Sequence, residues 1–311
     1  MSFRVLVTGA SGFIGRAAIS ALAAAGHNVR AASRRPNRTP NDANIEWVEL
    51  PDLGEAVDWS RLVAGTDVVV HLAAIAHRNE SEDGDYLRVN HVAAAGLAAC
   101  CRRHAVKRLI FMSSIGVQAG SPADHVVTEI DEPRPVTGYD RAKLAAEEDI
   151  RRSGAPFTIL RPVIVYGAGA KANIALLIRI AALPLPLPFG AFRNRRSMVA
   201  IENLVQAVAL CLAGQQTLNE TFIVADPEPI TLADMFVTLR EGAGRSAWLV
   251  PVPPIAIKAL LTATGQSELW ERMGRELVAS SAKLQMAGWS PQIETRAGLR
   301  SMVTNAALEV L

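Results

Sequence analysis

The sequence predicts an α/β fold, in which a doubly wound parallel sheet is followed by a smaller mixed α/β lobe. Short apolar, β-branched runs alternate with alanine-rich helical stretches through the first half of the chain. Strands this apolar are buried on both faces, as in a parallel sheet covered by helices. The first run also leads directly into a glycine-rich turn and a helix, which is typical of the start of a doubly wound domain.

Each element follows from the local pattern, in chain order. The expected strands of the first half are 3–8, 29–33, 45–50, 67–71, 106–113 and 157–160. The expected helices are 13–25, which ends at Gly26 as a C-cap, then 86–104 and 139–153. Beyond Pro162 the pattern is mixed, with expected helices 173–182, 201–213, 231–241, 255–264 and 296–308 and a strand at 221–225. We therefore divide the chain into a sheet domain at 1–165 and a lobe at 166–311, some of whose elements can return to the first sheet.

Composition excludes several classes of protein. Half of the 311 residues are hydrophobic and a fifth are charged, which excludes intrinsic disorder. The net charge of +2 creates no general field that would favour nucleic acid. The three cysteines, Cys100, Cys101 and Cys211, lack metal-site spacing, so we expect no metal and a reducing, cytoplasmic compartment.

Two long apolar stretches, 174–192 and 248–265, are interrupted by prolines and by Arg179 and Lys258. A spanning helix needs about 20 clean apolar residues. Both stretches are therefore predicted to be buried or pocket-forming segments, and we expect no membrane span. Contact of 248–261 with a membrane surface is the less favoured alternative.

The glycine-rich turn runs from Thr8 to Gly15 and includes Ser11, Phe13 and Ile14. In such a turn the first glycine permits the tight bend and the second admits a pyrophosphate. The third lets the helix pack closely on the strand. The N-terminus of that helix then faces the anion. Gly9, Gly12 and Gly15 have this spacing directly after the first strand, so they predict dinucleotide binding. The alternative is a strand–helix turn without a ligand.

The end of the second strand indicates which dinucleotide is bound. An NAD site usually has an acidic residue there for the ribose hydroxyls. This chain has Ser33, followed by Arg34 and Arg35, and arginine can bind a 2′-phosphate bidentately. We therefore favour NADP(H), with NAD(H) possible. The alternative is that Arg34, Arg35 and Arg38 form a solvated loop.

A serine, a tyrosine and a lysine follow in an order typical of proton transfer. Ser114 ends the fifth strand, and Tyr139 and Lys143 lie four residues apart on one face of a helix. We expect the lysine ammonium to stabilise the phenolate and so lower the tyrosine pKa toward working pH. The phenol can then exchange a proton with an alcohol oxygen, held by the serine, as hydride moves. The alternative is a surface Tyr and Lys on an amphipathic helix.

These motifs, with His71-Leu72-Ala73-Ala74 and Leu160-Arg161-Pro162, resemble the extended short-chain dehydrogenase/reductase family over nearly the whole chain. The resemblance implies that 1–165 is an NAD(P)-binding Rossmann domain and 166–311 mainly a nucleotide-sugar-binding lobe. It implies Ser114, Tyr139 and Lys143 as catalytic residues, with Asn90 supporting the active site. The implied cofactor contacts are Gly9, Ser11, Gly12, Phe13, Ile14, Gly15, Ser33, Arg34, Asp52, Leu53, Leu72, Ala73, Ala74, Tyr139, Lys143 and Pro162.

The resemblance implies a nucleotide-sugar substrate held by Ser114 of the first domain and, in the second lobe, by Asn173, Arg196 and Arg272, with Arg275 as an alternative to Arg272. Arginine suits this role because its guanidinium binds phosphate bidentately. Two further cations, at 193 and 195, add local positive charge.

The two residues after the expected catalytic serine limit which reactions of the family are possible. Sugar 4,6-dehydratases of this family have Asp-Glu there, whereas Ser114 is followed by Ile115-Gly116, which cannot move a proton. That leaves a 4-ketoreductase or a 4-epimerase that keeps NAD bound, and the Ser33-Arg34-Arg35 strand end favours the reductase. Segments 171–173, 184–190, 194–197 and 250–254 resemble the reductases that convert UDP-4-keto-6-deoxy-N-acetylhexosamine to UDP-N-acetylquinovosamine for bacterial surface polysaccharide. A non-catalytic NADP-binding sensor is the remote alternative.

Small residues on helices 86–104 and 139–153 permit close helix–helix approach. The resemblance implies that these helices pair into an intersubunit four-helix bundle, so we expect a homodimer. The alternative is that the small residues pack only on their own sheet.

Overall fold

The computed structural model describes residues 2–36, 43–75, 83–120, 123–170, 173–267, 270, 274 and 276–308. Its centre is a seven-stranded sheet with the order β10-β6-β5-β4-β1-β2-β3, in which every pairing is parallel. The strands are β1 (Arg4–Thr8), β2 (Asn28–Ser33), β3 (Ile45–Glu49), β4 (Val68–His71), β5 (Arg108–Met112), β6 (Phe157–Pro162) and β10 (Glu220–Val224). This confirms the predicted fold class.

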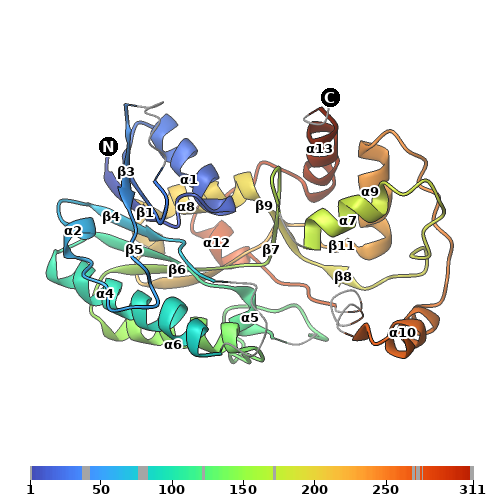
Figure 1. Cartoon of the computed structure of the whole chain (residues 1–311), viewed down its shortest axis with the longest axis horizontal. Helices are drawn as coiled ribbons and strands as arrows, with labels where there is room; N and C mark the ends of the chain where they lie inside the picture. The colour runs from blue at the N-terminus through green and yellow to red at the C-terminus, as the bar shows by residue number, and fades with distance from the viewer. Residues whose placement is uncertain are drawn as a thin grey trace.

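Helices cover both faces of the sheet, as Figure 1 shows. One face is covered by α1 (Phe13–Ala24), α8 (Ile201–Cys211) and α12 (Ala282–Met286). The other is covered by α2 (Ser60–Val63), α4 (Ala93–Arg103) and α6 (Gly138–Arg152). Alternate residues of β1 enter the two cores, since Val5 and Val7 belong to the first and Leu6 to the second.

The long helix expected at 86–104 is interrupted. The chain forms α3 (Asp83–Tyr86), then a π-helical turn at Leu87–Val92, and only then α4. The π turn carries Asn90, which is fully buried. Its Oδ1 accepts from the Ile75 N–H at 2.9 Å and its Nδ2 donates to the Ile75 carbonyl at 2.8 Å. The turn thus aims one amide at the loop that follows β4, a placement often seen near functional sites.

The second lobe contains two small ladders and its own core. β7 (Ile164–Tyr166) pairs in parallel with β9 (Met198–Ala200), and β8 (Arg195–Arg196) pairs antiparallel with β11 (Ile230–Thr231). Around them lie α7 (Asn173–Ala181), α9 (Leu232–Gly242), α10 (Pro254–Ala263) and α13 (Thr295–Leu308). Two elements beyond residue 166 return to the first domain. Strand β10 joins the central sheet beside β6, and α8 packs on α1 over one face of that sheet.

Segment 276–279 joins the two parts of the molecule. On one side the amides of Ala123 and Val127 donate to the carbonyls of Glu276 and Val278. On the other, the Leu277 N–H donates to the Arg195 carbonyl at 3.0 Å. The loop after α5 (Ile115–Gln118) and strand β8 are therefore held on opposite sides of one extended segment.

The two apolar stretches have different outcomes. The first contributes Ile174, Leu187 and Phe192 to the core of the lobe, as predicted. In the second, the expectation of burial is wrong for α10, which has no buried residue. Across the described residues, no helix has the length and apolarity that a membrane crossing requires.

Candidate active site

The glycine-rich turn is built so that no side chain fills it. Gly9 has a φ of +71°, and a Cβ there would lie 2.7 Å from the Ala73 nitrogen. A Cβ on Gly15 would overlap the Gly9 carbonyl oxygen. Gly12 precedes α1 and offers no side-chain cap, so the first N–H groups of the helix stay available to an anion. The turn therefore fits the pyrophosphate of a dinucleotide.

A buried histidine fixes the loop that faces this turn. The Thr8 Oγ1 lies 2.8 Å from His71 Nδ1 and accepts from the Ala73 N–H at 3.3 Å. Burial lowers the pKa of His71 to about 3, so the ring is neutral, and it stacks on Phe111 with ring centroids 5.9 Å apart. Loop 72–74 is thereby anchored to the end of β1. Sequence reasoning missed this role of Thr8 and His71, although both lie in quoted motifs.

At the end of β2, the Ser33 hydroxyl is buried and donates to Ser11 Oγ at 2.9 Å, while Arg34 and Arg35 are exposed. Arg35 lines a shallow pocket with Ser11 and Arg16, whose Nη1 donates to the Ser11 carbonyl at 2.7 Å. The remaining lining residues, Ile19, Ser20, Ile45 and Trp47, add no carboxylate. Sequence reasoning missed Arg16, and Arg38 lies outside the described residues.

Two other predicted cofactor contacts follow β3. The Asp52 Oδ1 accepts from the Gly54 N–H at 2.9 Å and so shapes a turn, while Leu53 is buried against the sheet. Pro162 ends β6. These positions all lie at the carboxyl edge of the parallel strands, where doubly wound folds bind ligands.

The serine and tyrosine that are predicted to be catalytic are held by two helix starts that touch. Ser114 is the N-cap of α5, and its Oγ accepts from the Gly116 N–H at 3.0 Å. A Cβ on Gly116 would overlap the carboxylate of Asp140. Asp140 forms a capping box with Thr137 at the start of α6, next to Tyr139. The structure thus packs the Ser114 turn directly on the helix that carries the tyrosine.

Lys143 is buried beneath this turn. Its Nζ donates to the Met112 carbonyl at 2.8 Å and lies 4.6 Å from the Phe111 ring centroid and 6.0 Å from that of Tyr139. Burial lowers the pKa of Lys143 to about 7, and the neighbouring Glu147 opposes that shift.

The expectation that Lys143 lowers the tyrosine pKa is wrong. The pKa of Tyr139 is raised above its usual value, first by burial of the phenol and then by Asp140 and Tyr86. The Tyr86 ring lies edge-on to that of Tyr139, with centroids 6.0 Å apart. The lysine cannot compensate, because it is itself desolvated and bonded to Met112. Tyr139 is therefore a neutral phenol that can donate a proton.

A buried carboxylate joins the elements around these residues. Glu147, one turn beyond Lys143, accepts from Ser113 Oγ at 2.6 Å and from Arg161 Nε at 2.9 Å. Arg161 also donates to Gln118 of α5. The network ties the ends of β5 and β6 to α5 and α6, and so fixes the turn that carries Ser114. Sequence reasoning missed Glu147, although its spacing of four from Lys143 places it on the same helix face.

The predicted substrate residues are less completely defined. Arg196 is half-buried in β8, and Arg195 pairs with Glu276, with Arg195 Nε 3.4 Å from the Glu276 Oε1. Arg193 is exposed. Asn173 begins α7, but its side chain lies outside the described part of the structure. The predictions for Arg272 and Arg275 also fall outside the described residues.

The cysteines take no part in this site. All three are buried and free, and burial raises the pKa of the Cys101 and Cys211 thiols to about 12. Such thiols are protonated and unreactive at neutral pH. Within the described ranges, His, Cys, Asp and Glu side chains form no group of three that could hold a metal ion.

Comparisons with known proteins agree with this geometry. Residues 5–225 match the model of the NAD dependent epimerase/dehydratase family. A UDP-glucose 4-epimerase of Vibrio cholerae is 30% identical over 307 residues, which cover 95% of this chain and 93% of that protein. A 4-hydroxy-2-methyl-3-oxo-4-farnesyl-3,4-dihydroquinoline-1-oxide ketoreductase of Stigmatella aurantiaca is 28% identical, over 88% of this chain and 82% of its own.

Among solved structures, MoeE5 in complex with UDP-glucose and NAD superposes with a TM-score of 0.78. The superposition covers 99% of this chain and all of that one, at 24% identity. This likeness supports the fold.

Proposed function

The chain belongs to the NAD dependent epimerase/dehydratase family, and from this premise we propose that it is a nucleotide-sugar 4-ketoreductase. The proposed substrate is a nucleotide-linked 4-keto-6-deoxy sugar of the UDP-N-acetylhexosamine type, used in the synthesis of surface polysaccharide precursors. The proposed product is the corresponding 4-hydroxy sugar.

The observation that carries the proposal is the end of β2. A reductase must exchange an oxidised cofactor for a reduced one after each turnover, and cells supply reducing power for synthesis mainly as NADPH. Ser33 ends β2, where an NAD-binding carboxylate is usual, and it is followed by the exposed Arg34 and Arg35. Arg35 and Arg16 line the pocket that includes Ser11, the hydrogen-bond partner of Ser33. These residues suit a 2′-phosphate, so we propose NADPH as the cofactor, with NADH as the alternative.

The proton chemistry follows from the neutral phenol. When bound, the nicotinamide supplies a hydride to the carbonyl carbon, and the carbonyl oxygen then needs one proton. We propose that Tyr139, whose raised pKa keeps it a neutral phenol, donates that proton. We propose that the Ser114 hydroxyl orients the same oxygen, and that Lys143 and Glu147 keep the turn and the helix in register.

A 4,6-dehydratase is disfavoured on packing grounds. That reaction needs carboxyl groups at the two positions after Ser114. Ile115 is buried, and any side chain at Gly116 would overlap Asp140. A proton-transferring group at the second position would therefore have to displace the Asp140 carboxylate, which caps α6.

In the second lobe, we propose that Arg196 binds the substrate diphosphate, together with Asn173 and Arg272. A half-buried guanidinium suits this role because it binds phosphate bidentately. Arg193 and Arg195 add positive charge nearby in the sequence.

A second candidate is a nucleotide-sugar 4-epimerase with tightly bound NAD. The similarity to the Vibrio 4-epimerase, over nearly the whole of both chains, favours it. Similarity to a ketoreductase over most of the chain supports the first candidate. The two reactions use serine, tyrosine and lysine alike, and differ in whether the cofactor leaves in a changed redox state.

The test is absorbance at 340 nm during incubation with a UDP-4-keto-6-deoxy-N-acetylhexosamine. We expect one NADPH to be oxidised for each sugar reduced. Interconversion of UDP-N-acetylhexosamine 4-epimers without net cofactor loss would establish the epimerase instead. Cofactor binding without turnover of either sugar would favour the remaining alternative, a non-catalytic NADP-binding sensor.

A further inference from the structure

Helix α10 is apolar on every side and yet is not covered. Its sequence, Pro254–Ala263, contains one charged residue, Lys258. A helix that is hydrophobic all round is normally buried. None of its residues is buried here, and Ile255 and Leu260 are 76% and 62% exposed.

The segment that leads into α10 extends this exposed surface. Trp248 is 58% exposed, and Val250 is also exposed. The Leu187 N–H donates to the Trp248 carbonyl at 3.1 Å, and the Val250 N–H donates to the Leu187 carbonyl at 2.8 Å. Loop 183–190, with its exposed Leu183 and Leu185, therefore lies beside 248–250. We call Leu183, Leu185, Trp248, Val250, Ile255 and Leu260 the apolar edge.

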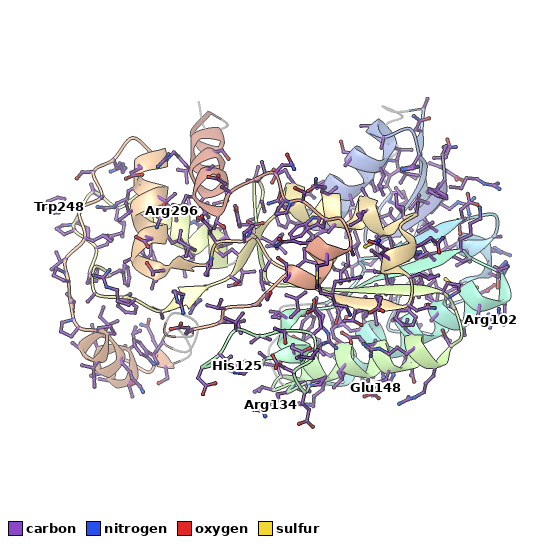
Figure 2. The ribbon with its side chains drawn as sticks, turned by 180° about the vertical axis from the view of Figure 1, so that it is seen from behind. Arg102, His125, Arg134, Glu148, Trp248 and Arg296 are labelled. Carbon is purple, nitrogen blue, oxygen red and sulfur yellow. The ribbon has the colours of Figure 1, made fainter. Side chains whose placement is uncertain are left out.

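A buried arginine holds the apolar edge in place. The guanidinium of Arg240, on α9, donates to five backbone carbonyls, those of Ala181, Leu183, Leu185, Ser246 and Trp248. The two loops are thus fixed by one internal cation, so the exposure of their apolar side chains is a built feature of the fold. Figure 2 shows Trp248 at the outer end of the second lobe, far from Arg102 at the opposite end of the molecule.

The two sequence segments that carry the apolar edge have charge of one sign. Segments 174–193 and 242–267 contain no aspartate or glutamate. They carry four exposed cations, Arg179, Arg193, Arg245 and Lys258. The surface therefore combines exposed aliphatic groups, one exposed tryptophan and positive charge.

We propose that the apolar edge docks the protein on an anionic lipid bilayer. Anionic headgroups would pair with the four cations, the aliphatic side chains would enter the acyl boundary, and tryptophan is favoured at that depth. A symmetric contact with a second copy would instead bring the same cations together, with no carboxylate in these segments to pair with them. The contact is superficial and requires no spanning helix.

Co-sedimentation of the full chain with vesicles tests this proposal. We expect binding to vesicles that contain phosphatidylglycerol, weak binding to pure phosphatidylcholine, and loss of binding at high salt. The double variant Ile255→Ser/Leu260→Ser should reduce partitioning by about tenfold or more, because burial of two large side chains is lost. Neither residue is buried, so the melting temperature should be unchanged.

The matched control is Ile130→Ser, which removes an isoleucine that is 94% exposed outside the apolar edge. It should bind vesicles like the parent. Equal binding by the double variant and the parent, or no binding to phosphatidylglycerol, overturns the proposal. A particle mass in light scattering that falls in the double variant would assign the apolar edge to a second copy instead. These readouts do not depend on the reaction that the enzyme catalyses.

Discussion

Single residues decide the proton chemistry of the site. The Tyr139 phenol is kept neutral by burial and by Asp140, and the Lys143 ammonium is bonded to Met112. A neutral phenol favours proton donation over proton abstraction. It is the form of Tyr139 that the proposed ketone reduction requires.

Tyr139→Phe should lower turnover by roughly 10²–10⁴-fold, the range typical of a lost general acid. The ring is retained, so unfolding should change little. Steady-state kinetics on the 4-keto sugar measures the effect. Tyr86→Phe removes the hydroxyl of the ring that lies against Tyr139 and should keep near-normal turnover. Loss of turnover in Tyr86→Phe with near-normal turnover in Tyr139→Phe would identify Tyr86 as the acid instead.

The proposed cofactor preference also depends on single side chains. Arg34→Ala and Arg35→Ala should each lower the affinity for NADPH by roughly 10–150-fold, since a charge-assisted hydrogen bond contributes about 1.5–3 kcal/mol. NADH binding should be almost unchanged. Fluorescence titration with both cofactors measures the ratio, and Arg102→Ala, at an exposed position on α4, is the control. An equal loss of affinity for NADPH and NADH, or a parent protein that prefers NADH, would contradict the assignment of NADPH.

His71 makes stability depend on pH. Its folded pKa, about 3, lies below the ordinary value of 6.5, so the unfolded chain binds more protons between these values. The free energy of unfolding should therefore fall as pH drops below 6.5, by up to about 1.4 kcal/mol per pH unit from this residue. Denaturant titrations at several pH values from 7 to 5 give the free energy of unfolding as a function of pH. This free energy should fall less steeply with decreasing pH for His71→Asn than for the parent. His104→Gln, at an exposed histidine, should keep the parent slope.

At the scale of elements, the contact between α5 and α6 packs the Ser114 turn against the start of the helix that carries Tyr139. A Cβ on Gly116 would overlap the Asp140 carboxylate, which also caps α6. Gly116→Ala should therefore destabilise the fold by about 1–3 kcal/mol, as overpacking does, and lower turnover as well. Gly84→Ala, where a Cβ meets only the end of Arg88 at 3.5 Å, is the control. Unchanged stability and turnover in Gly116→Ala would show that α6 does not depend on this contact.

For the whole molecule, the prediction of a homodimer concerns the small residues of α4 and α6. Ala93, Ala94, Ala98 and Ala146 pack in the core on their own sheet, as the alternative required, and Ala142 is also buried. Other small residues of the same helices, Ala95, Gly96, Ala99 and Ala145, are not buried in the single chain. We expect a second subunit to cover these small, partly or fully exposed positions of α4 and α6.

Light scattering at micromolar concentration should give roughly twice the chain mass. Ala99→Glu places a charge on the outer face of α4 and should reduce that mass to one chain. The Ile255→Ser/Leu260→Ser variant should leave it unchanged, because the apolar edge lies in the other lobe. A parent that is monomeric and fully active would exclude the four-helix bundle.

The parallel sheet, the order of its elements along the chain, and the spacing of the glycines and of Tyr139 and Lys143 could all be predicted from the amino-acid sequence. Those features depend on short-range physics: hydrophobic period, the freedom of glycine at positive φ, and helical spacing. The tertiary structure alone revealed that β10 joins β6, that a π turn buries Asn90, and that Glu147 meets Arg161. It also reversed the expected shift of the Tyr139 pKa and exposed α10. Pairing, burial and pKa depend on groups far apart in sequence, which local patterns do not specify.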